Sequence, residues 1–433
     1  MAITGRAVFL AFVGVLLVFL AAPAGTWVLW AVLGALAALL LTDLALAANS
    51  RRVRLEAGGA TSVRLGEDAA VFLIVANPDK RTLRATVRDA WAPSAVAGPR
   101  VHDLVVPAGE RRRVETTLTP VRRGDQHRAH VTVRSYGPLG LAARQSTHAV
   151  PWSVRALPPF HSRRHLPGKL SKLRELDGQH RAMIRGQGSE FDSLREYVPG
   201  DDVRSIDWRA TARRETVVVR TWRPERDRRL LVVLDTGRTS AGRVGDTPRL
   251  DHAMDAGLLL TALAGKAGDR VELLAYDRRV RAQVRSQGRG STLQAIVRAM
   301  TPLEPELVES DSAGLVATIL GRQSRTRQLV VLLTDLNAAA MEEGLLPRLS
   351  ALTARHMVLV AAVGDPKVAE MAAQRGDAQS VYGAAAAQKT LAERRRITAE
   401  LRRHGVEVVD AGPEEIAPAL ADAYISLKAQ GRL

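Results

Sequence analysis

The sequence predicts a membrane helical hairpin, followed by an all-β sandwich-like domain and then an α/β domain with a doubly wound parallel sheet. Three features of the hydrophobic pattern lead to this prediction. Two long apolar runs open the chain, apolar residues then alternate with polar ones, and from residue 229 strand-like apolar runs alternate with helical stretches. We therefore expect four segments, at residues 1–50, 51–155, 156–228 and 229–433.

The composition is that of a globular protein with a large excess of basic residues. A chain of 433 residues is too long for one compact core, and 25% of its residues are charged. The formal net charge of +17 would attract nucleic acid, anionic lipid or an acidic partner, unless the arginine content simply follows the base composition of the genome. The chain contains no cysteine, which excludes disulfides and cysteine-based metal sites.

The first segment contains two apolar runs, at residues 7–22 and 26–48. Each run approaches or exceeds the ~20 residues that a helix needs to cross a bilayer. The Pro23-Ala24-Gly25 sequence between them predicts a turn, and two tryptophans beside it fit an interfacial aromatic belt, Trp27 and Trp30. The segment is therefore expected to form two transmembrane helices joined as a hairpin.

Basic residues flank both apolar runs at the open end of this hairpin, namely Arg6, Arg51, Arg52 and Arg54. The positive-inside rule then predicts a multi-pass protein of the cell inner (cytoplasmic) membrane, with the main body in the cytoplasm. The alternative is a signal peptide cleaved near Ala22, which would leave the second run as a stop-transfer helix. Asp43, near the end of the second run, is interpreted as an interfacial carboxylate rather than a proton relay.

The segment from residue 52 to residue 155 has the alternation of short antiparallel strands separated by Gly, Pro and Asn, which predicts a small sandwich. Its histidines are scattered, and His127 with His130 lacks an obvious third metal ligand. We interpret this domain as a spacer or docking module. Prolines between residues 151 and 167 then predict an irregular linker.

Acidic and basic residues alternate closely in EFDSLREYVPGDDVRSIDWR, at residues 190–209. This alternation is typical of an interlocking network of ion pairs. Asp201, Asp202 and Asp207 form the alternative, a cluster that could gather a divalent cation if the three carboxylates converged. We favour the structural interpretation.

Four strand-like runs follow in the last segment, LLVVLD, RVELLAYD, RQLVVLLTD and HMVLVAAVG, with helical stretches between them. This order is typical of a doubly wound sheet, and nearly continuous apolar strands indicate burial on both faces. Asp235 ends the first strand and is followed by Thr236-Gly237-Arg238-Thr239-Ser240. Open α/β sheets bind ligands at the carboxyl ends of their strands, so these polar residues mark a candidate site.

The run from Glu190 to Arg220, the LVVLD strand and the ending AYISLKAQGRL resemble the bacterial domain-of-unknown-function 58 family. The resemblance extends from end to end and implies a membrane hairpin, a β-rich middle and a von Willebrand factor type A-like domain. It also implies a partner, since such proteins commonly accompany MoxR-type AAA+ ATPases. The family name concedes that no activity is established.

The resemblance to von Willebrand factor type A domains implies a Mg²⁺ site that is weak or absent. Such domains hold a divalent ion with an Asp-x-Ser-x-Ser motif, a threonine and a second aspartate. Gly237 replaces one serine of the motif, so water or Ser240 would have to supply the missing ligand. The expected metal ligands are therefore Asp235, Thr239, Ser240, Thr292 and Asp335.

Several catalytic motifs are absent from the sequence, including GxxxxGK[ST], GxSxG and HExxH. We therefore expect a non-enzymatic membrane-anchored scaffold or adaptor. The family resemblance implies that it works with a MoxR-type AAA+ ATPase in assembling or remodelling other proteins. A metal-dependent phosphoester hydrolase is the first alternative. Electrostatic attachment to anionic lipid or nucleic acid is the second, although no specific nucleic acid is expected.

Overall fold

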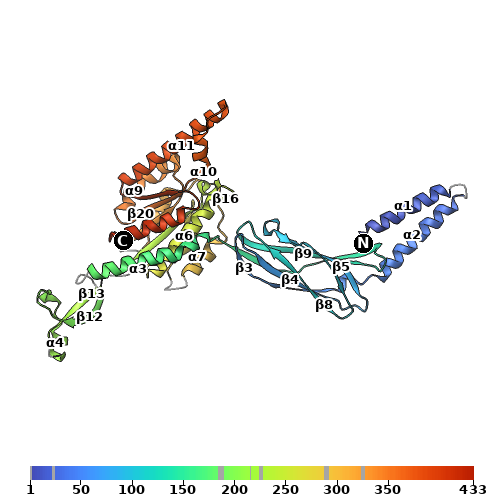
Figure 1. Ribbon diagram of the computed structural model, residues 1–433, viewed down its shortest axis with the longest axis horizontal. Coiled ribbons are helices and arrows are strands. Elements are labelled where there is room, and N and C mark those ends of the chain that lie inside the picture. The colour runs from blue at the N-terminus through green and yellow to red at the C-terminus, as the bar shows by residue number, and fades with distance from the viewer. Residues whose placement is uncertain are drawn as a thin grey trace. The chain divides into compact units, whose positions relative to one another are not determined.

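The computed structural model describes residues 2–21, 25–183, 190–214, 216–223, 228–286, 292–322 and 327–433. The chain divides into two compact units, residues 1–157 and 158–433 (Figure 1). The first unit contains the two apolar helices and the β-rich domain. The second contains the segment 158–228 and the α/β domain.

Two apolar helices open the first unit, α1 (Gly5–Leu20) and α2 (Trp27–Leu46), and they lie side by side (Figure 1). Gly14 of α1 lies against Val32 of α2, where an added Cβ would come within 2.9 Å of the valine side chain. One helix of the described residues, 27–52, is long and apolar enough to cross a membrane, whereas Gly5–Leu20 is a shorter apolar helix. At 1.5 Å per residue, α1 is about 24 Å long, less than the ~30 Å of a bilayer core.

Asp43 is fully buried near the end of α2, which corrects its interpretation as an interfacial carboxylate. Its carboxylate accepts hydrogen bonds from the backbone N–H groups of Leu139, Leu141 and Ala142, at 2.7, 2.7 and 2.9 Å. These residues belong to the turn 137–142 of the β-rich domain, which we call the 137–142 turn. The carboxylate therefore attaches the end of α2 directly to this domain, a contact that no pattern in the sequence indicates.

The β-rich domain consists of two sheets with a common core. The larger sheet contains β1 (Ala2–Ile3), β3 (Ser62–Arg64), β5 (Leu83–Trp91), β7 (Val101–Val106), β9 (Gly124–Tyr136), β10 (Ala142–His148) and β11 (Ser153–Leu157). The smaller contains β2 (Arg54–Gly59), β4 (Ala69–Ala76), β6 (Ala97–Gly98) and β8 (Arg111–Leu118). All pairings are antiparallel except β3 with β11. Side chains from both sheets meet in the core, as alternation of apolar residues predicts.

The second unit begins with a helix where the prolines predicted an irregular linker. A 3₁₀ turn (His161–His165) leads into α3 (Leu166–Met183). Pro167 is the second residue of α3, and proline is tolerated there because the first turn of a helix has no N–H partner to lose. Leu173 is buried, and Lys169 pairs with Asp422 on the last helix of the chain. Tertiary contacts therefore stabilise a helix that local composition did not predict.

The segment 190–223 forms a two-stranded antiparallel hairpin, β12 (Glu190–Glu196) with β13 (Val218–Arg223), and a short helix α4 (Trp208–Arg214). The carboxylates that could have gathered a cation are each bound locally. Asp201 pairs with Arg195, Asp202 accepts from Arg204 N, and Asp207 pairs with Arg220 at 2.9 Å. Arg195 holds the pKa of Asp201 below its usual value, as the predicted ion-paired arrangement requires.

The α/β domain is built on a six-stranded sheet in the order β18-β17-β14-β19-β20-β21. The strands are β14 (Arg229–Asp235), β17 (Arg270–Tyr276), β18 (Val280–Val284), β19 (Leu329–Leu333), β20 (Met357–Val363) and β21 (Glu407–Ala411). All neighbours are parallel except β18, which runs antiparallel to β17. Only residues 277–279 join these two strands, and so short a connection permits only a hairpin.

Helices cover both faces of this sheet. One face packs against α6 (Arg249–Lys266), α7 (Thr292–Met300) and α12 (Ile416–Ala429). The other face forms a buried cluster with α8 (Ser312–Leu320), the π-helical turn η6 (Ala340–Leu345), α9 (Leu346–Thr353) and α11 (Ala378–Arg403). Shorter elements are α5 (Arg238–Ala241), β15 (Arg243–Val244), β16 (Thr247–Pro248) and α10 (Pro366–Ala373). The sheet thus has the doubly wound arrangement, with one antiparallel edge strand.

Candidate functional site

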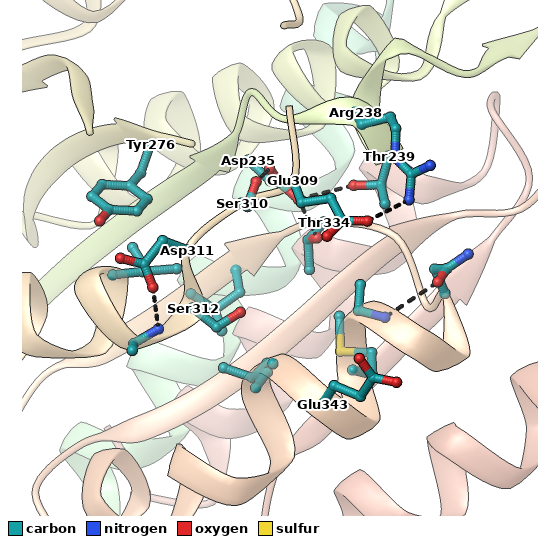
Figure 2. Close-up of a pocket in the computed structure, with 18 of the residues that line it drawn as sticks. Asp235, Arg238, Thr239, Tyr276, Glu309, Ser310, Asp311, Ser312, Thr334 and Glu343 are labelled. Atoms are coloured by element: carbon teal, nitrogen blue, oxygen red, sulfur yellow. Dashed lines mark hydrogen bonds and ion pairs between the residues drawn. The ribbon is translucent and has the colours of Figure 1, made fainter. Parts of the chain in front are cut away.

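Asp235 lies at the carboxyl end of β14, at the centre of a set of hydroxyl groups (Figure 2). Its Oδ2 accepts hydrogen bonds from Thr239 Oγ1 at 3.1 Å and Thr334 Oγ1 at 2.6 Å. Its Oδ1 accepts from Gly237 N at 2.9 Å and Ser310 Oγ at 2.5 Å. Four donors therefore fix the orientation of one carboxylate at the edge where open α/β sheets bind ligands.

The side chain of Ser310 explains why position 237 is a glycine. A Cβ added at residue 237 would collide with Ser310 Oγ and lie 2.9 Å from Val308 O. Glycine therefore leaves the space that Ser310 occupies, and Ser310 supplies a hydroxyl next to Asp235 from a different loop. The sequence indicated a missing hydroxyl at position 237, but it did not indicate that residue 310 would replace it.

Thr334 is the other residue that sequence reasoning missed. It follows β19 directly and stands one position before the predicted ligand Asp335. Because β14 and β19 are parallel neighbours, their carboxyl ends meet and the Thr334 hydroxyl reaches Asp235. A signal was present, since a threonine at the end of a buried strand adjacent to β14 is a candidate for this edge.

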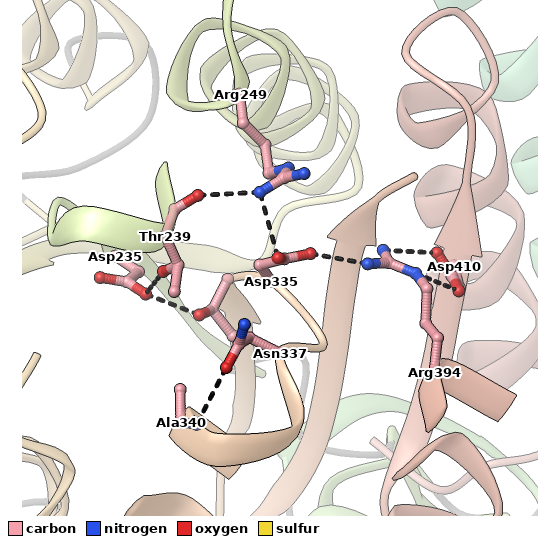
Figure 3. Close-up of polar contacts among 9 residues, drawn as sticks. Asp235, Thr239, Arg249, Asp335, Asn337, Ala340, Arg394 and Asp410 are labelled. Atoms are coloured by element: carbon pink, nitrogen blue, oxygen red, sulfur yellow. Dashed lines mark hydrogen bonds and ion pairs between the residues drawn. The ribbon is translucent and has the colours of Figure 1, made fainter. Parts of the chain in front are cut away.

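Asp335 binds two arginines, an arrangement that does not fit its expected role as a metal ligand (Figure 3). Its Oδ2 accepts from Arg249 Nη1 at 3.0 Å, and its Oδ1 accepts from Arg394 Nη1 at 2.7 Å. Arg394 also pairs with Asp410. Burial lowers the pKa of Arg394, but the carboxylates of Asp410 and Asp335 raise it by more than burial lowers it. The pKa therefore lies above its usual value, and the guanidinium stays charged. A cation at Asp335 would have to displace two guanidinium groups.

The remaining predicted ligands have different surroundings. Ser240 is buried in α5, where its N–H donates to Gly237 O at 3.0 Å. Thr292 begins α7, and the loop residues before it, 287–291, lie outside the described residues. In the described part of the chain, no cluster of three or more His, Cys, Asp or Glu side chains could hold a metal ion. The expectation of Mg²⁺ at Asp235 stays a prediction, which rests on the resemblance to von Willebrand factor type A domains.

A cavity of about 320 Å³ opens next to Asp235, and we call it the Asp235 pocket (Figure 2). It lies among the carboxyl ends of β14 and β19, the start of α8 and the turn η6. Its lining combines apolar side chains with acidic and hydroxyl groups, including Val233, Leu315, Leu332, Met341, Leu345, Thr239, Ser310, Asp311, Glu309 and Glu343. The Asp235 pocket is therefore able to receive a group that is partly apolar and partly polar.

Comparison with known proteins gives a family match without an activity. Residues 193–407 match the model of the family described as "Protein of unknown function DUF58". The uncharacterized protein Rv1480 of Mycobacterium tuberculosis is 32% identical over 200 residues, which are 45% of this chain and 61% of that protein. The uncharacterized protein YeaD of Bacillus subtilis is 26% identical over 126 residues, or 27% of this chain and 29% of that protein. The chain thus spans about 61% of the mycobacterial relative.

Solved structures show only loose likenesses. An aerotolerance-related membrane protein from Bacteroides fragilis aligns with 46% of this chain and 98% of its own, at 15% identity and a TM-score of 0.31. The CARDB domain of the PF1109 protein from Pyrococcus furiosus aligns with 26% of this chain and 91% of its own, at 11% identity and a TM-score of 0.20. Neither likeness defines the fold of either unit.

Proposed function

We propose that this chain is a DUF58 protein along its whole length and that it acts as a membrane-anchored docking module, not as an enzyme. Its α/β domain would be von Willebrand factor type A-like, with the Asp235 pocket as the docking surface. The observation that carries this proposal is the carboxylate of Asp235, which four donors hold rigidly at the mouth of a formed cavity. A fixed carboxylate with satisfied hydrogen bonds suits recognition, because little side-chain entropy is lost on binding.

The two apolar helices would anchor the protein in a bacterial inner membrane, with the body in the cytoplasm. Large apolar side chains are exposed on both helices, including Phe12 at 68% and Trp30 at 71%. Exposure of this kind is costly in water and favourable in lipid. The arginines at the open end of the hairpin support a cytoplasmic orientation. The length of α2 supports one span, and α1 as a second span is part of the proposal.

The hydrolase alternative is less well supported by the geometry. Metal-assisted hydrolysis needs a cation held by several oxygen ligands with an open position. The second carboxylate expected near Asp235 is Asp335, and two arginines bind it. The hydroxyls of Thr239, Ser310 and Thr334 all donate to Asp235, so all three would have to share this one carboxylate as their base.

The partner proposed for the Asp235 pocket is a MoxR-type AAA+ ATPase, as the family resemblance implies. The test is co-purification of a recombinant ATPase of this type with the full chain in lipid nanodiscs. Asp235→Asn should weaken recovery at least about fivefold, because the neutral amide cannot accept from all four donors. Asp377→Asn is the matched control, since Asp377 caps α11 outside the pocket lining and asparagine caps equally well. Equal recovery with Asp235→Asn would contradict a docking role for this pocket.

A further inference from the structure

We infer that the Asp235 pocket receives the side chain of an arginine or lysine from a partner protein. The inference rests on the docking role proposed above, but it does not depend on which protein the partner is. It follows from the shape of the cavity, the composition of its floor and the charge of its rim.

The floor of the Asp235 pocket is apolar. Val233 of β14, Leu332 and Leu333 of β19, and Met341 and Leu345 of η6 line it, and all five are at most 4% exposed. A volume of about 320 Å³ is at the lower end of the range for small-ligand sites. Such a space suits a single long side chain, whose methylene groups would replace water against this floor.

The rim of the pocket is acidic although the protein is strongly basic. Four carboxylates and two guanidinium groups line the pocket, a net charge of −2, whereas the whole chain carries +17. The acidic residues are Asp235, Glu309, Asp311 and Glu343, and the basic residues are Arg238 and Arg348. A local reversal of sign against so basic a background would attract a cation and repel an acidic group.

Two of these carboxylates have capacity for a new partner. Asp311 Oδ1 caps α8 by accepting from Ala313 N and Gly314 N, both at 3.0 Å, and in the described part of the chain Asp311 forms no ion pair. Glu343 is exposed and likewise has no ion pair among the described residues. Glu309, by contrast, already pairs with Arg238 at 2.8 Å. The pocket therefore offers Asp311 and Glu343 to an incoming charge.

The basic residues of the rim do not neutralise Asp311 or Glu343 in the described contacts. Arg348 donates to two backbone carbonyls, Gly344 O at 2.8 Å and Glu343 O at 3.4 Å, and it forms no ion pair with the Glu343 carboxylate in the described contacts. Burial, together with the charges of Asp311 and Asp277, raises the pKa of the neighbouring Tyr276, as expected where the local potential is negative. A cationic head group that reaches Asp311 or Glu343 would form charge-assisted hydrogen bonds with that carboxylate.

The test uses the full chain in lipid nanodiscs and a pair of probes that differ in charge only. N-acetyl-arginine amide carries a guanidinium group, and N-acetyl-citrulline amide has nearly the same shape without the charge. Binding is measured by saturation-transfer NMR titration. We expect the arginine probe to bind about tenfold or more tightly than the citrulline probe, because ionised pairs are stronger than neutral hydrogen bonds. Equal binding of the two probes, or no binding of the arginine probe at about 10 mM, would overturn the inference.

Two variants locate the binding. Asp311→Asn removes the charge but keeps a residue that caps helices well, so α8 should remain folded. Glu343→Gln changes an exposed side chain that forms no ion pair among the described residues. Each variant should weaken the arginine probe about threefold to tenfold. Glu342→Gln is the control, because this adjacent acid pairs with Arg396 and does not line the pocket.

The outcomes separate this inference from the proposed function. Unchanged binding in both Asp311→Asn and Glu343→Gln would place the probe elsewhere and overturn the inference. If the probe binds as expected but the ATPase is not recovered, the assignment of the ATPase fails and the pocket chemistry stands. If the ATPase is recovered through Asp235 while the arginine probe does not bind, only the inference about the basic side chain fails.

Discussion

Gly237 and Ser310 are 73 positions apart, yet they determine together which hydroxyl groups surround Asp235. Gly237 has no side chain, and the hydroxyl of Ser310 occupies the space that a side chain at position 237 would need. The combined effect is a carboxylate that accepts three hydroxyl donors, from Thr239, Ser310 and Thr334. A substitution that looks like the loss of a ligand in the sequence is therefore compensated in the structure.

This pairing predicts that substitutions at the two positions are not additive. Gly237→Ala should destabilise the loops around Asp235 by about 1–3 kcal/mol, because its Cβ collides with Ser310 Oγ. Ser310→Ala removes that oxygen, so the double variant should lose less than the sum of the single variants. Hydrogen exchange of the amides at the end of β14 measures the local opening free energy.

Gly265→Ala is the control, since nothing lies within 4 Å of a Cβ at that helical position. It should be neutral or slightly stabilising, because alanine favours a helix more than glycine does. Additive losses for Gly237→Ala and Ser310→Ala would show that the two residues do not share one space.

At the scale of elements, α2 and the 137–142 turn depend on each other. The buried carboxylate of Asp43 accepts three backbone N–H groups of the turn, and Arg144 Nε donates to Leu44 O at 3.0 Å. Gly137 has no side chain because an added Cβ would collide with Asp43. The start of α1 is bound to the same turn, since Thr4 Oγ1 donates to Gly140 O at 2.7 Å. The two apolar helices and the β-rich domain therefore belong to one structural unit.

Asp43→Ala should release the 137–142 turn and destabilise the first unit by about 2–4 kcal/mol, because three buried N–H groups lose their acceptor. The expected result is faster hydrogen exchange of Leu139, Leu141 and Ala142 in nanodiscs. Thr42→Ala is the matched control, since the exposed Thr42 hydroxyl bonds only to carbonyls of its own helix, in the described contacts. Unchanged exchange in Asp43→Ala would mean that the carboxylate does not hold the turn.

At the scale of the whole molecule, the proposed two-span hairpin predicts how the chain is oriented in the membrane. The protein has no cysteine, so a single introduced cysteine is a unique label. Thr26 is exposed between α1 and α2, and Arg111 is exposed on β8. If both helices cross the membrane, the first position faces the outside of the inner membrane and the second faces the cytoplasm.

We therefore expect Thr26→Cys to react with a membrane-impermeant maleimide in intact spheroplasts, and Arg111→Cys to react only after lysis. Mass shift of the purified protein measures the labelling. Protection of Thr26→Cys until lysis would contradict the two-span topology, and labelling of Arg111→Cys in intact spheroplasts would contradict a cytoplasmic body.

Long-range ion pairs hold the second unit together across segments distant in sequence. Arg249, Asp335, Arg394 and Asp410 form one chain of contacts from α6 to β21 (Figure 3). At the opposite edge of the sheet, Tyr424 and Lys428 bind the buried Asp269. These last contacts give the ending AYISLKAQGRL a structural role, because its tyrosine and lysine attach the final helix to the turn before β17.

Periodicity alone predicted much of the architecture. Apolar runs indicated the amino-terminal helices, alternation indicated the β-rich region, and buried strands separated by helical stretches indicated the mixed α/β part. Asp235 was predicted at the end of its strand for the same reason, since it follows directly on an apolar run. These features depend on local pattern, because one face of each element must be buried.

Only the tertiary structure decided which side chains meet. It placed Ser310 beside Gly237, gave Asp335 to two arginines, buried Asp43 under a turn almost 100 residues away, and formed α3 where prolines predicted a linker. Each of these contacts joins segments whose separation in sequence carries no signal of their proximity. A hydrogen bond or ion pair forms only where the fold brings two groups within about 3 Å, which the sequence does not show. Burial of one face of a helix or strand, by contrast, requires a periodic apolar pattern that can be read from the sequence.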